Sequence, residues 1–190
     1  MLPKLRIAQP APVTTYRVVA ALGAMALLVA GLVNPSDSPM VALARYVTIG
    51  AMVSLLATSY AFPWARRHLG WGAYLVNSLV VVYLCTMLYT TQIDPESMIA
   101  SFVGVMICGM ALHRIPLVIT FLATASAIHI ATVFAVAEPM VGPLAFTINM
   151  VLYSLFLGVV LSMQIAARQR RLRSESIVEA IFDQSSDALL

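Results

Sequence analysis

The sequence predicts an all-α membrane protein with six transmembrane helices, both termini in the cytoplasm and a last helix that extends into the cytoplasm. The composition is the first observation behind this prediction. Of the 190 residues, 61% are hydrophobic and 10% are charged, whereas soluble domains carry about 25% charged residues. The mean hydropathy is +0.93. A chain of this composition belongs in a bilayer, and little of it is left for a soluble domain.

The apolar residues form six runs, which are the second observation. A helix needs about 20 residues to cross a bilayer. The runs cover approximately residues 16–34, 41–62, 71–92, 98–112, 117–137 and 144–166. Proline or glycine occurs in every connection, as in "NPSDSP" and "EPMVGP", and both residues end helices. The six runs therefore predict six spans, of which the fourth is the shortest.

The distribution of charge is the third observation, and it predicts the topology. Ten of the eleven basic residues fall on one side of the six runs, and Arg45 falls near the other side. The connections on that other side carry Asp37, Asp94, Glu96 and Glu138. Connections rich in Lys and Arg stay in the cytoplasm. Both chain termini are therefore expected inside the cell.

Several classes of function are excluded or weakened by what the runs lack. Lys4 is the only lysine and precedes the first run, so a retinal Schiff base cannot form within the membrane. No Asp or Glu occurs within a run, whereas ion-coupled carriers place ionisable groups there. Cys85 and Cys108 lie inside apolar runs and are expected to pack as small hydrophobic residues. We expect no cofactor, no metal site, no disulfide and no nucleic-acid partner.

His129 is the candidate for a ligand contact inside the membrane. The fifth run leads outward, so His129 lies about 18 Å from its inner end at 1.5 Å per residue, in the outer half of the bilayer. The simpler interpretation is a hydrogen bond to another helix, and the alternative is contact with a ligand. On the opposite side of the same run, alanines recur every four residues and predict close packing against another helix. These alanines are Ala123, Ala127, Ala131 and Ala135.

Further side chains of the outer half could share a cavity with His129. Such a cavity would be mostly apolar with a few oriented polar atoms, as small-molecule sites are. The candidate residues are Ser126, Thr132, Tyr83, Met87, Thr90, Asn149 and Tyr153. The alternative is that Asn149 bonds a neighbouring helix and that Tyr89 belongs to the aromatic belt at the membrane surface. The sequence leaves this choice open.

The last run continues into a polar tail without a helix breaker. No glycine or proline occurs between Gly158 and Leu190, so one continuous helix is expected to leave the membrane. Its apolar positions beyond the membrane need a partner, and a parallel homodimer is the simplest one. A heptad register through Ile165 and Leu172 also places charged residues at core positions, so the pattern is imperfect. The residues expected to transmit a signal are Arg168, Arg170, Arg171, Leu172, Arg173, Ile177, Ile181 and Phe182.

The end of the chain, "IVEAIFDQSSDALL", resembles the opening of a PAS domain, where a short helix leads through an "xxxSxDAhh" stretch into the first strand. Ser186 and Asp187 match that stretch, with Ala188, Leu189 and Leu190 after them. The resemblance covers about the last fourteen residues. It implies the N-terminal membrane sensor region of a bacterial signalling protein, located in the inner (cytoplasmic) membrane. In such proteins a PAS domain and a histidine kinase or GGDEF diguanylate cyclase output follow.

These observations divide the chain into three parts and predict its function. Residues 1–15 form a cytoplasmic lead, residues 16–166 a six-span sensor domain, and residues 167–190 a connecting helix with the start of a PAS-like domain. The expected function is detection of a small apolar ligand or a membrane state, and transmission of a helix movement to a cytoplasmic output domain in cis. We expect no enzymatic activity in this stretch. The alternatives are a small transporter or carrier subunit, and a membrane enzyme centred on His129.

Overall fold

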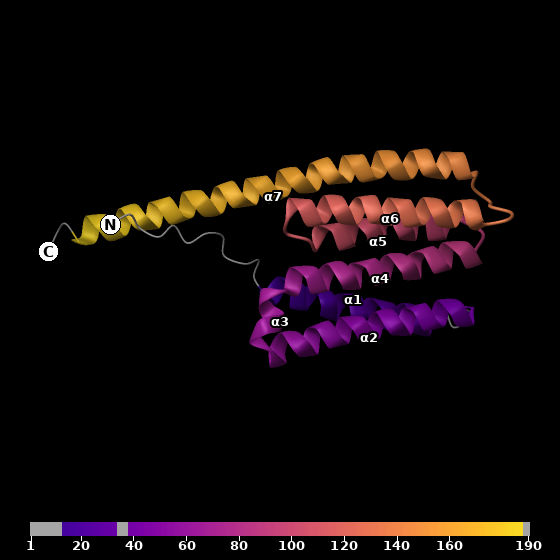
Figure 1. Cartoon of the computed structure of the whole chain (residues 1–190), viewed down its shortest axis with the longest axis horizontal. Helices are drawn as coiled ribbons and strands as arrows, with labels where there is room; N and C mark the ends of the chain where they lie inside the picture. Colours follow the sequence, from indigo (N-terminus) through magenta and orange to yellow (C-terminus); the bar gives the residue numbers. More distant parts are fainter. Residues whose placement is uncertain (1–12, 34–37, 188–190) are drawn as a thin grey trace.

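The computed structural model describes the backbone of residues 13–33 and 38–187, and the side chains in these ranges up to Val178. The described chain is entirely helical outside its turns, and its long helices run antiparallel to the long helices that precede and follow them in the sequence (Figure 1). The helices are α1 (Val13–Val33), α2 (Pro39–Ala61), α3 (Pro63–Arg67), α4 (Leu69–Thr90), α5 (Pro95–Met110), α6 (Ile115–Ala135) and α7 (Pro143–Asp187).

Each of the six predicted runs becomes a helix that begins one to three residues earlier than predicted. Turn chemistry explains the early starts. Ser38 and Asp94 cap the helices that follow, with Val41 N donating to Ser38 Oγ at 3.3 Å and Ser97 N donating to Asp94 Oδ1 at 2.9 Å. A proline occupies the first turn in both cases, where its missing N–H costs no hydrogen bond. The short helix α3 was not predicted.

Five of the helices are long and apolar enough to cross a membrane: α1, α2, α4, α6 and α7. The chain is therefore a multi-pass all-helical membrane protein. The fourth predicted span corresponds to α5, which has 16 residues and is about 24 Å long at 1.5 Å per residue. It is shorter than a hydrocarbon core of about 30 Å, although it lies alongside α4 and α6 (Figure 1).

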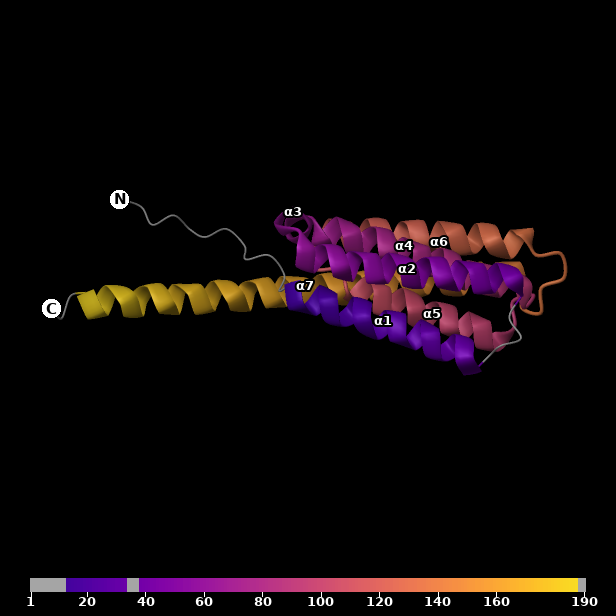
Figure 2. The ribbon, with the colours of Figure 1, turned by 90° about the horizontal axis from the view of Figure 1, so that it is seen from below.

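Helix α4 is the centre of the bundle. It contacts α2 on one side and α6 on the other, and α5 packs against it as well. The pair α1 and α2 flanks α4 at one edge, and α6 and α7 form the other edge (Figures 1 and 2). The core lies where these helices meet, with Leu88, Val105 and Phe121 almost fully buried. Cys85 and Cys108 are both buried as free thiols. This agrees with the prediction that they pack as small hydrophobic residues.

One end of the bundle carries most of the described basic residues. Helix α3, the starts of α1, α4 and α6, and the exit of α7 all lie at that end (Figure 1). Arg45 lies near the other end of the bundle, as predicted, in the second turn of α2. Its side chain is 5% exposed and is therefore buried in the protein.

The alanine stripe of α6 contradicts the packing predicted for it. Ala123, Ala127, Ala131 and Ala135 are all exposed. The opposite side of α6 carries the buried residues and packs against α4 and α7. Two neighbours suffice to cover one side of a helix, so no further described helix lies against the alanines. The prediction that both sides of α6 contact protein is wrong for the described part of a single chain.

Helix α7 is one uninterrupted helix of 45 residues, which confirms the prediction of a continuous rod. At 1.5 Å per residue it is about 68 Å long, about twice the length of a membrane span. Its first half packs against α5 and α6, and its second half projects past the basic end of the bundle (Figures 1 and 2).

Candidate functional site

His129 is fully buried in α6, at 0% exposure. Its Nδ1 lies 2.8 Å from the carbonyl oxygen of Ala125. A carbonyl can only accept, so Nδ1 carries a proton and donates it, and in the neutral ring Nε2 holds a lone pair. Nε2 finds no hydrogen-bond partner among the described residues. The helix-bridging hydrogen bond that the sequence favoured is absent from the described residues, because the imidazole bonds its own helix instead.

A column of rings connects His129 to α7 and α5. The imidazole stacks on Phe146 of α7, with centroids 6.5 Å apart and planes inclined by 18°. Phe146 stacks in turn on Phe102 of α5 at 5.8 Å. Tyr153 of α7 lies 5.0 Å from the Phe102 ring and donates its hydroxyl to the Phe102 carbonyl at 2.8 Å. The column joins three helices in the half of the bundle farthest from the basic end.

Ser101 is a polar residue beside this column that sequence reasoning missed. It directly precedes Phe102 of the column on α5, a helix that packs against both α6 and α7. Its Oγ is fully buried and has no hydrogen-bond partner among the described residues. A serine in an apolar helix gives no signal that separates it from solvent-facing serines, so the sequence could not single it out.

Two of the predicted site residues lie on the same helix as His129. Ser126 forms a hydrogen bond with Ser154 of α7, with 2.7 Å between the two Oγ atoms. Thr132 donates to the carbonyl of Ile128 on its own helix at 2.9 Å. Ser126 thus lies at the contact of α6 and α7, Thr132 lies beside Cys85 of α4, and Tyr153 of α7 bonds α5.

The remaining predicted residues do not join His129. Tyr83 is buried on α4, where its ring centroid lies 5.9 Å from Cζ of Arg45 on α2. Thr90 is exposed and donates to the carbonyls of Thr86 and Met87 on its own helix. Asn149 is exposed and donates to Ala145 O at 2.8 Å, so it does not bond a neighbouring helix. Met87 is half-buried on α4. Among the described side chains, the contacts of Tyr83, Thr90 and Asn149 do not involve His129.

Arg45 is the second residue that sequence reasoning missed as a site. Its guanidinium lies so close to the backbone of Gly31 on α1 that a Cβ there would come within 2.5 Å of Nη1. Arg45 thus brings α1, α2 and the Tyr83 ring of α4 together. Charged residues inside a span are rare and mark functional or structural contacts. The signal was present in the sequence, because Arg45 fell within the second apolar run.

At the basic end, His113 connects three helices. Its ring lies 5.1 Å from the Tyr16 ring of α1, and Nδ1 bonds the carbonyl of Ala111 at 2.9 Å. Burial lowers the pKa of His113, the bond to Ala111 opposes this shift, and the positive charge of Arg168 on α7 lowers the pKa further. The neutral ring is therefore favoured where α1, the α5–α6 connection and α7 meet.

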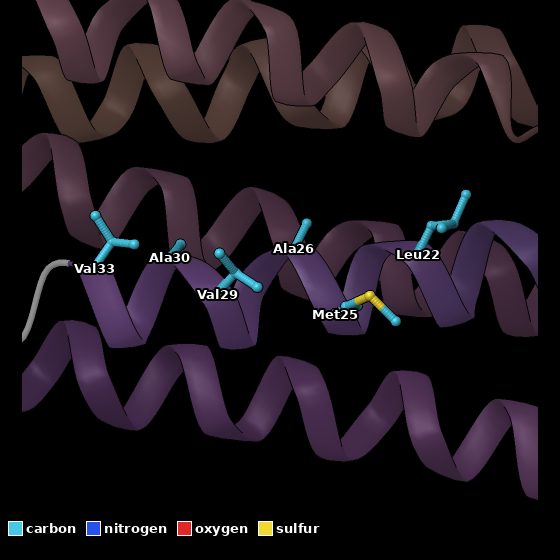
Figure 3. Close-up of a pocket in the computed structure, with 6 residues that line it drawn as sticks. All are labelled: Leu22, Met25, Ala26, Val29, Ala30 and Val33. Carbon is cyan, nitrogen blue, oxygen red and sulfur yellow. The ribbon is translucent and has the colours of Figure 1, made fainter.

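An open groove of about 530 Å³ runs along one side of α1 (Figure 3). It is lined by Leu22, Met25, Ala26, Val29, Ala30 and Val33. None of these side chains carries a polar atom, so the groove offers no group that would orient a ligand. It resembles the surface that any membrane helix presents to lipid chains and is separate from His129.

The predicted signal-transmission residues lie on the projecting half of α7. Arg168, Arg170, Leu172, Arg173 and Ile177 are exposed. Arg171 is exposed too and pairs with Glu175 one turn further on, with 3.2 Å between Nε and Oε1. The side chains of Ile181 and Phe182, and the PAS-like residues Ala188 to Leu190, lie outside the described residues.

Comparison of the chain with protein families, with curated proteins and with solved structures found no match.

Proposed function

We propose that this chain is the membrane sensory module of a bacterial signalling protein, which detects a small apolar ligand or a state of the bilayer and passes a movement of α7 to an output domain. The observation that carries the proposal is the continuity of α7. A single helix runs from the outer-half aromatic column, through the bundle, to a point far beyond it. A helix without a break transmits a rotation or a shift along its whole length, because its backbone hydrogen bonds resist bending.

The aromatic column gives that movement a starting point. The imidazole of His129 stacks on the ring of Phe146, which is the fourth residue of α7. Nε2 is fully buried, so a ligand reaches its lone pair only when α6 and α7 move apart. A ligand with a hydrogen-bond donor would then favour the separated arrangement by its differential affinity for the two states. Occupancy of this position would thereby change the position of α7.

The charge distribution supports the orientation that this function requires. The end of the bundle from which α7 projects carries Arg66, Arg67, Arg114 and Arg168. Basic segments next to membrane helices stay in the cytoplasm. The projecting half of α7 would then lie in the cytoplasm, where a PAS domain and a histidine kinase or diguanylate cyclase would receive the movement.

The test is an insertion series in α7. One, two, three or four residues are inserted after Arg173 in the chain fused to a diguanylate cyclase, and the cyclic dinucleotide is measured in cells. Each inserted residue rotates the downstream part by about 100°. Output that rises and falls with the helical phase supports the proposal, and output that ignores the insertions rules it out.

A pair of variants separates sensing from folding. His129→Phe keeps the ring stack on Phe146 and removes the lone pair, whereas His129→Ala also leaves a cavity. We expect His129→Phe to keep the stability of the bundle and to change the response of the fused cyclase. Solute flux through liposomes that depends on His129 would instead identify a transporter.

A further inference from the structure

Two arginines from different helices come together where α7 leaves the bundle. Arg114 directly precedes α6, and Arg168 lies on α7. Ser126 of α6 and Ser154 of α7 are level with each other, since 2.7 Å separates their hydroxyl oxygens. Arg114 lies twelve residues before Ser126, and Ala166 lies twelve residues after Ser154. Because α6 and α7 are antiparallel neighbours, Arg114 is level with Ala166, and Arg168 lies about 3 Å further along the bundle.

The charges of both arginines act on the same pair of rings. The ring centroids of Tyr16 and His113 lie 5.1 Å apart. The charge of Arg114 acts on Tyr16. Burial lowers the pKa of His113, and the charge of Arg168 lowers it further. Two guanidinium groups this close to one ring pair repel each other, and an anion between them lowers the electrostatic energy of both.

No described carboxylate supplies that anion. The chain has no Asp or Glu between Glu96 and Glu138, or between Glu138 and Glu175. Glu175 pairs with Arg171, and Glu96 and Glu138 lie at the end of the bundle away from the basic end. Among the described side chains, neither of the two guanidinium groups has an ion-pair or hydrogen-bond partner. Their charge is left for a group outside the described chain.

The bilayer carries anions at this level. Helix α6 has 21 residues and is about 32 Å long at 1.5 Å per residue, which matches a hydrocarbon core of about 30 Å. Arg114, immediately before α6, therefore lies where the hydrocarbon ends and the headgroups begin. Both arginines are exposed, so a headgroup can reach them. Guanidinium groups bind phosphate oxygens in bidentate geometry, and basic sites between membrane helices bind anionic headgroups.

We propose that Arg114 and Arg168 form a site, called the α6–α7 phosphate site, which binds the headgroup phosphate of an anionic phospholipid from the surrounding bilayer. Two cations without a carboxylate favour a headgroup with net negative charge over a zwitterionic one. An exposed apolar side chain lies five residues from each arginine on the membrane side, Ile119 on α6 and Met163 on α7. Lipid chains can cover these side chains, whereas free phosphate cannot.

An occupied site joins α6 to α7 at the point where the projecting half of α7 begins. The lipid composition would then be one state of the bilayer that acts on α7. This last step rests on the proposed function, whereas the lipid binding itself does not. Insertions after Arg173 leave Arg114 and Arg168 in place, so the insertion series tests the function and the lipid measurement tests the site.

Lipid-dependent stability of the full chain tests the site. The chain is reconstituted in phosphatidylcholine nanodiscs with and without phosphatidylglycerol, and the melting temperature is measured. A ligand that binds only the folded chain raises this temperature. The variant R114Q/R168Q removes both charges of the site. The matched control is R66Q/R67Q, which removes two exposed charges from α3 at the same end of the bundle, where α3 packs against α2 and α4 (Figure 1).

We expect phosphatidylglycerol to raise the melting temperature of the unaltered chain and of R66Q/R67Q by several degrees, and R114Q/R168Q to lose most of that rise. R168Q alone should lose part of it, and R114K/R168K, which keeps both charges, should retain most of it. No rise in the unaltered chain, or equal losses in R114Q/R168Q and R66Q/R67Q, would overturn the site. An equal rise from inorganic phosphate in phosphatidylcholine nanodiscs would overturn the lipid as its ligand.

Discussion

Single polar side chains hold neighbouring helices in register in the half of the bundle toward the basic end. Arg17 of α1 donates from Nε to Ser59 Oγ of α2 at 2.9 Å. Asn77 of α4 donates to the carbonyl of Cys108 on α5 at 2.8 Å. Within a membrane such bonds contribute modestly, on average about 0.6 kcal/mol in one well-studied bundle. Their value lies in fixing which residues face each other.

The hydroxyl of Tyr153 provides a direct measure of one such bond. Tyr153→Phe keeps the ring against Phe102 and removes the hydrogen bond to its carbonyl. We expect the free energy of unfolding in detergent to fall by about 1 kcal/mol, the usual net value of a hydrogen bond. Tyr89→Phe is the matched control, because Tyr89 is exposed. Equal losses for both variants would show that the bond from Tyr153 contributes nothing.

His113 makes stability depend on pH. Its pKa is lowered in the folded chain by burial and by Arg168, so the unfolded chain binds a proton more readily. The neutral ring therefore contributes stability at neutral pH, and this contribution is lost as the pH falls below the ordinary histidine value of about 6.5. Tyr16, Arg114 and Arg168 are the titratable or charged groups around it.

We expect the melting temperature in detergent to fall between about pH 7 and pH 5, a window set by the histidine pKa. His113→Asn should flatten part of that dependence. His68→Asn, at an exposed position of the same end where the ring stacks on Trp64, is the matched control for a histidine substitution. An unaltered pH profile in His113→Asn would contradict this assignment.

At the scale of the element, the start of α5 matters because this helix is short. Asp94 caps it through the bond from Ser97 N, and Thr91 and Ser97 share a further bond at 2.8 Å between their hydroxyls. Partial burial raises the pKa of Asp94, but the bonds from Ser97 and Thr91 outweigh it and leave the pKa below its ordinary value. The charged carboxylate is thus the form that the turn binds.

Removal of this cap should loosen α5. Asp94→Ala is expected to lower the free energy of unfolding by about 1 kcal/mol, the typical cost of losing such a cap. Glu96→Ala, two residues on in the same first turn, should cost less, because it removes a carboxylate without a capping bond. Hydrogen exchange of the α5 amides is the measurement. The loss should be local to α5, and equal exchange in the two variants would contradict it.

The sequence predicted best those helices that are defined by the composition of a long stretch of residues. The rod of α7 followed from the absence of glycine and proline, and the six helices followed from six apolar runs. The short helix α3 was missed because five residues between two turns leave no periodic pattern. The exposed alanines of α6 were misassigned because small residues suit a close helix contact and a lipid-facing surface equally well. Hydropathy cannot separate these two environments, since lipid chains are as apolar as a protein core.

At the scale of the whole molecule, the number of helices that cross the bilayer decides on which side of the membrane each connection lies. If α5 crosses the bilayer with the five longer helices, the basic end and the projecting half of α7 share one side. Trp64 and Ser174 would then be on that side, and Glu96 on the other. A membrane side for Ser174 that differs from that of Trp64 would contradict this arrangement.

We expect an impermeant maleimide to label Glu96→Cys on intact cells, and Trp64→Cys and Ser174→Cys only after the cells are opened. Basic connections retained in the cytoplasm are the physical reason. Labelling of Ser174→Cys on intact cells would show an odd number of crossings. Cys85 and Cys108 are buried and should give little background.

The candidate site shows how far a sequence leads in a molecule of this kind. His129 stood out because it is a polar residue deep in an apolar run, and it proved to be fully buried. The residues that contact His129 were not predictable from the sequence. Which side chains meet depends on how each helix is rotated about its own axis and how far it is shifted along the bundle. Tyr83 faces Arg45, and Thr90 and Asn149 bond their own helices. Phe146, which stacks on His129, and Ser101, which precedes Phe102 of the same column, have ordinary apolar-helix sequence contexts.

A hydrogen bond between two turns at the end of the bundle away from the basic end gives α7 the properties of a lever. Met140 N, in the α6–α7 turn, donates at 2.8 Å to the carbonyl of Gln92 in the α4–α5 turn. Gln92 and Ile93 adopt the left-handed backbone, with φ of 53° and 61°, and Ile93 is fully buried. These contacts hold the end of α7 that lies away from the basic end, and its projecting half makes no contact with the described bundle. A tilt of about 5° around the held end moves the tip of a rod about 68 Å long by about 6 Å. A displacement too small to reorder the bundle would therefore exceed one helical turn at the far end.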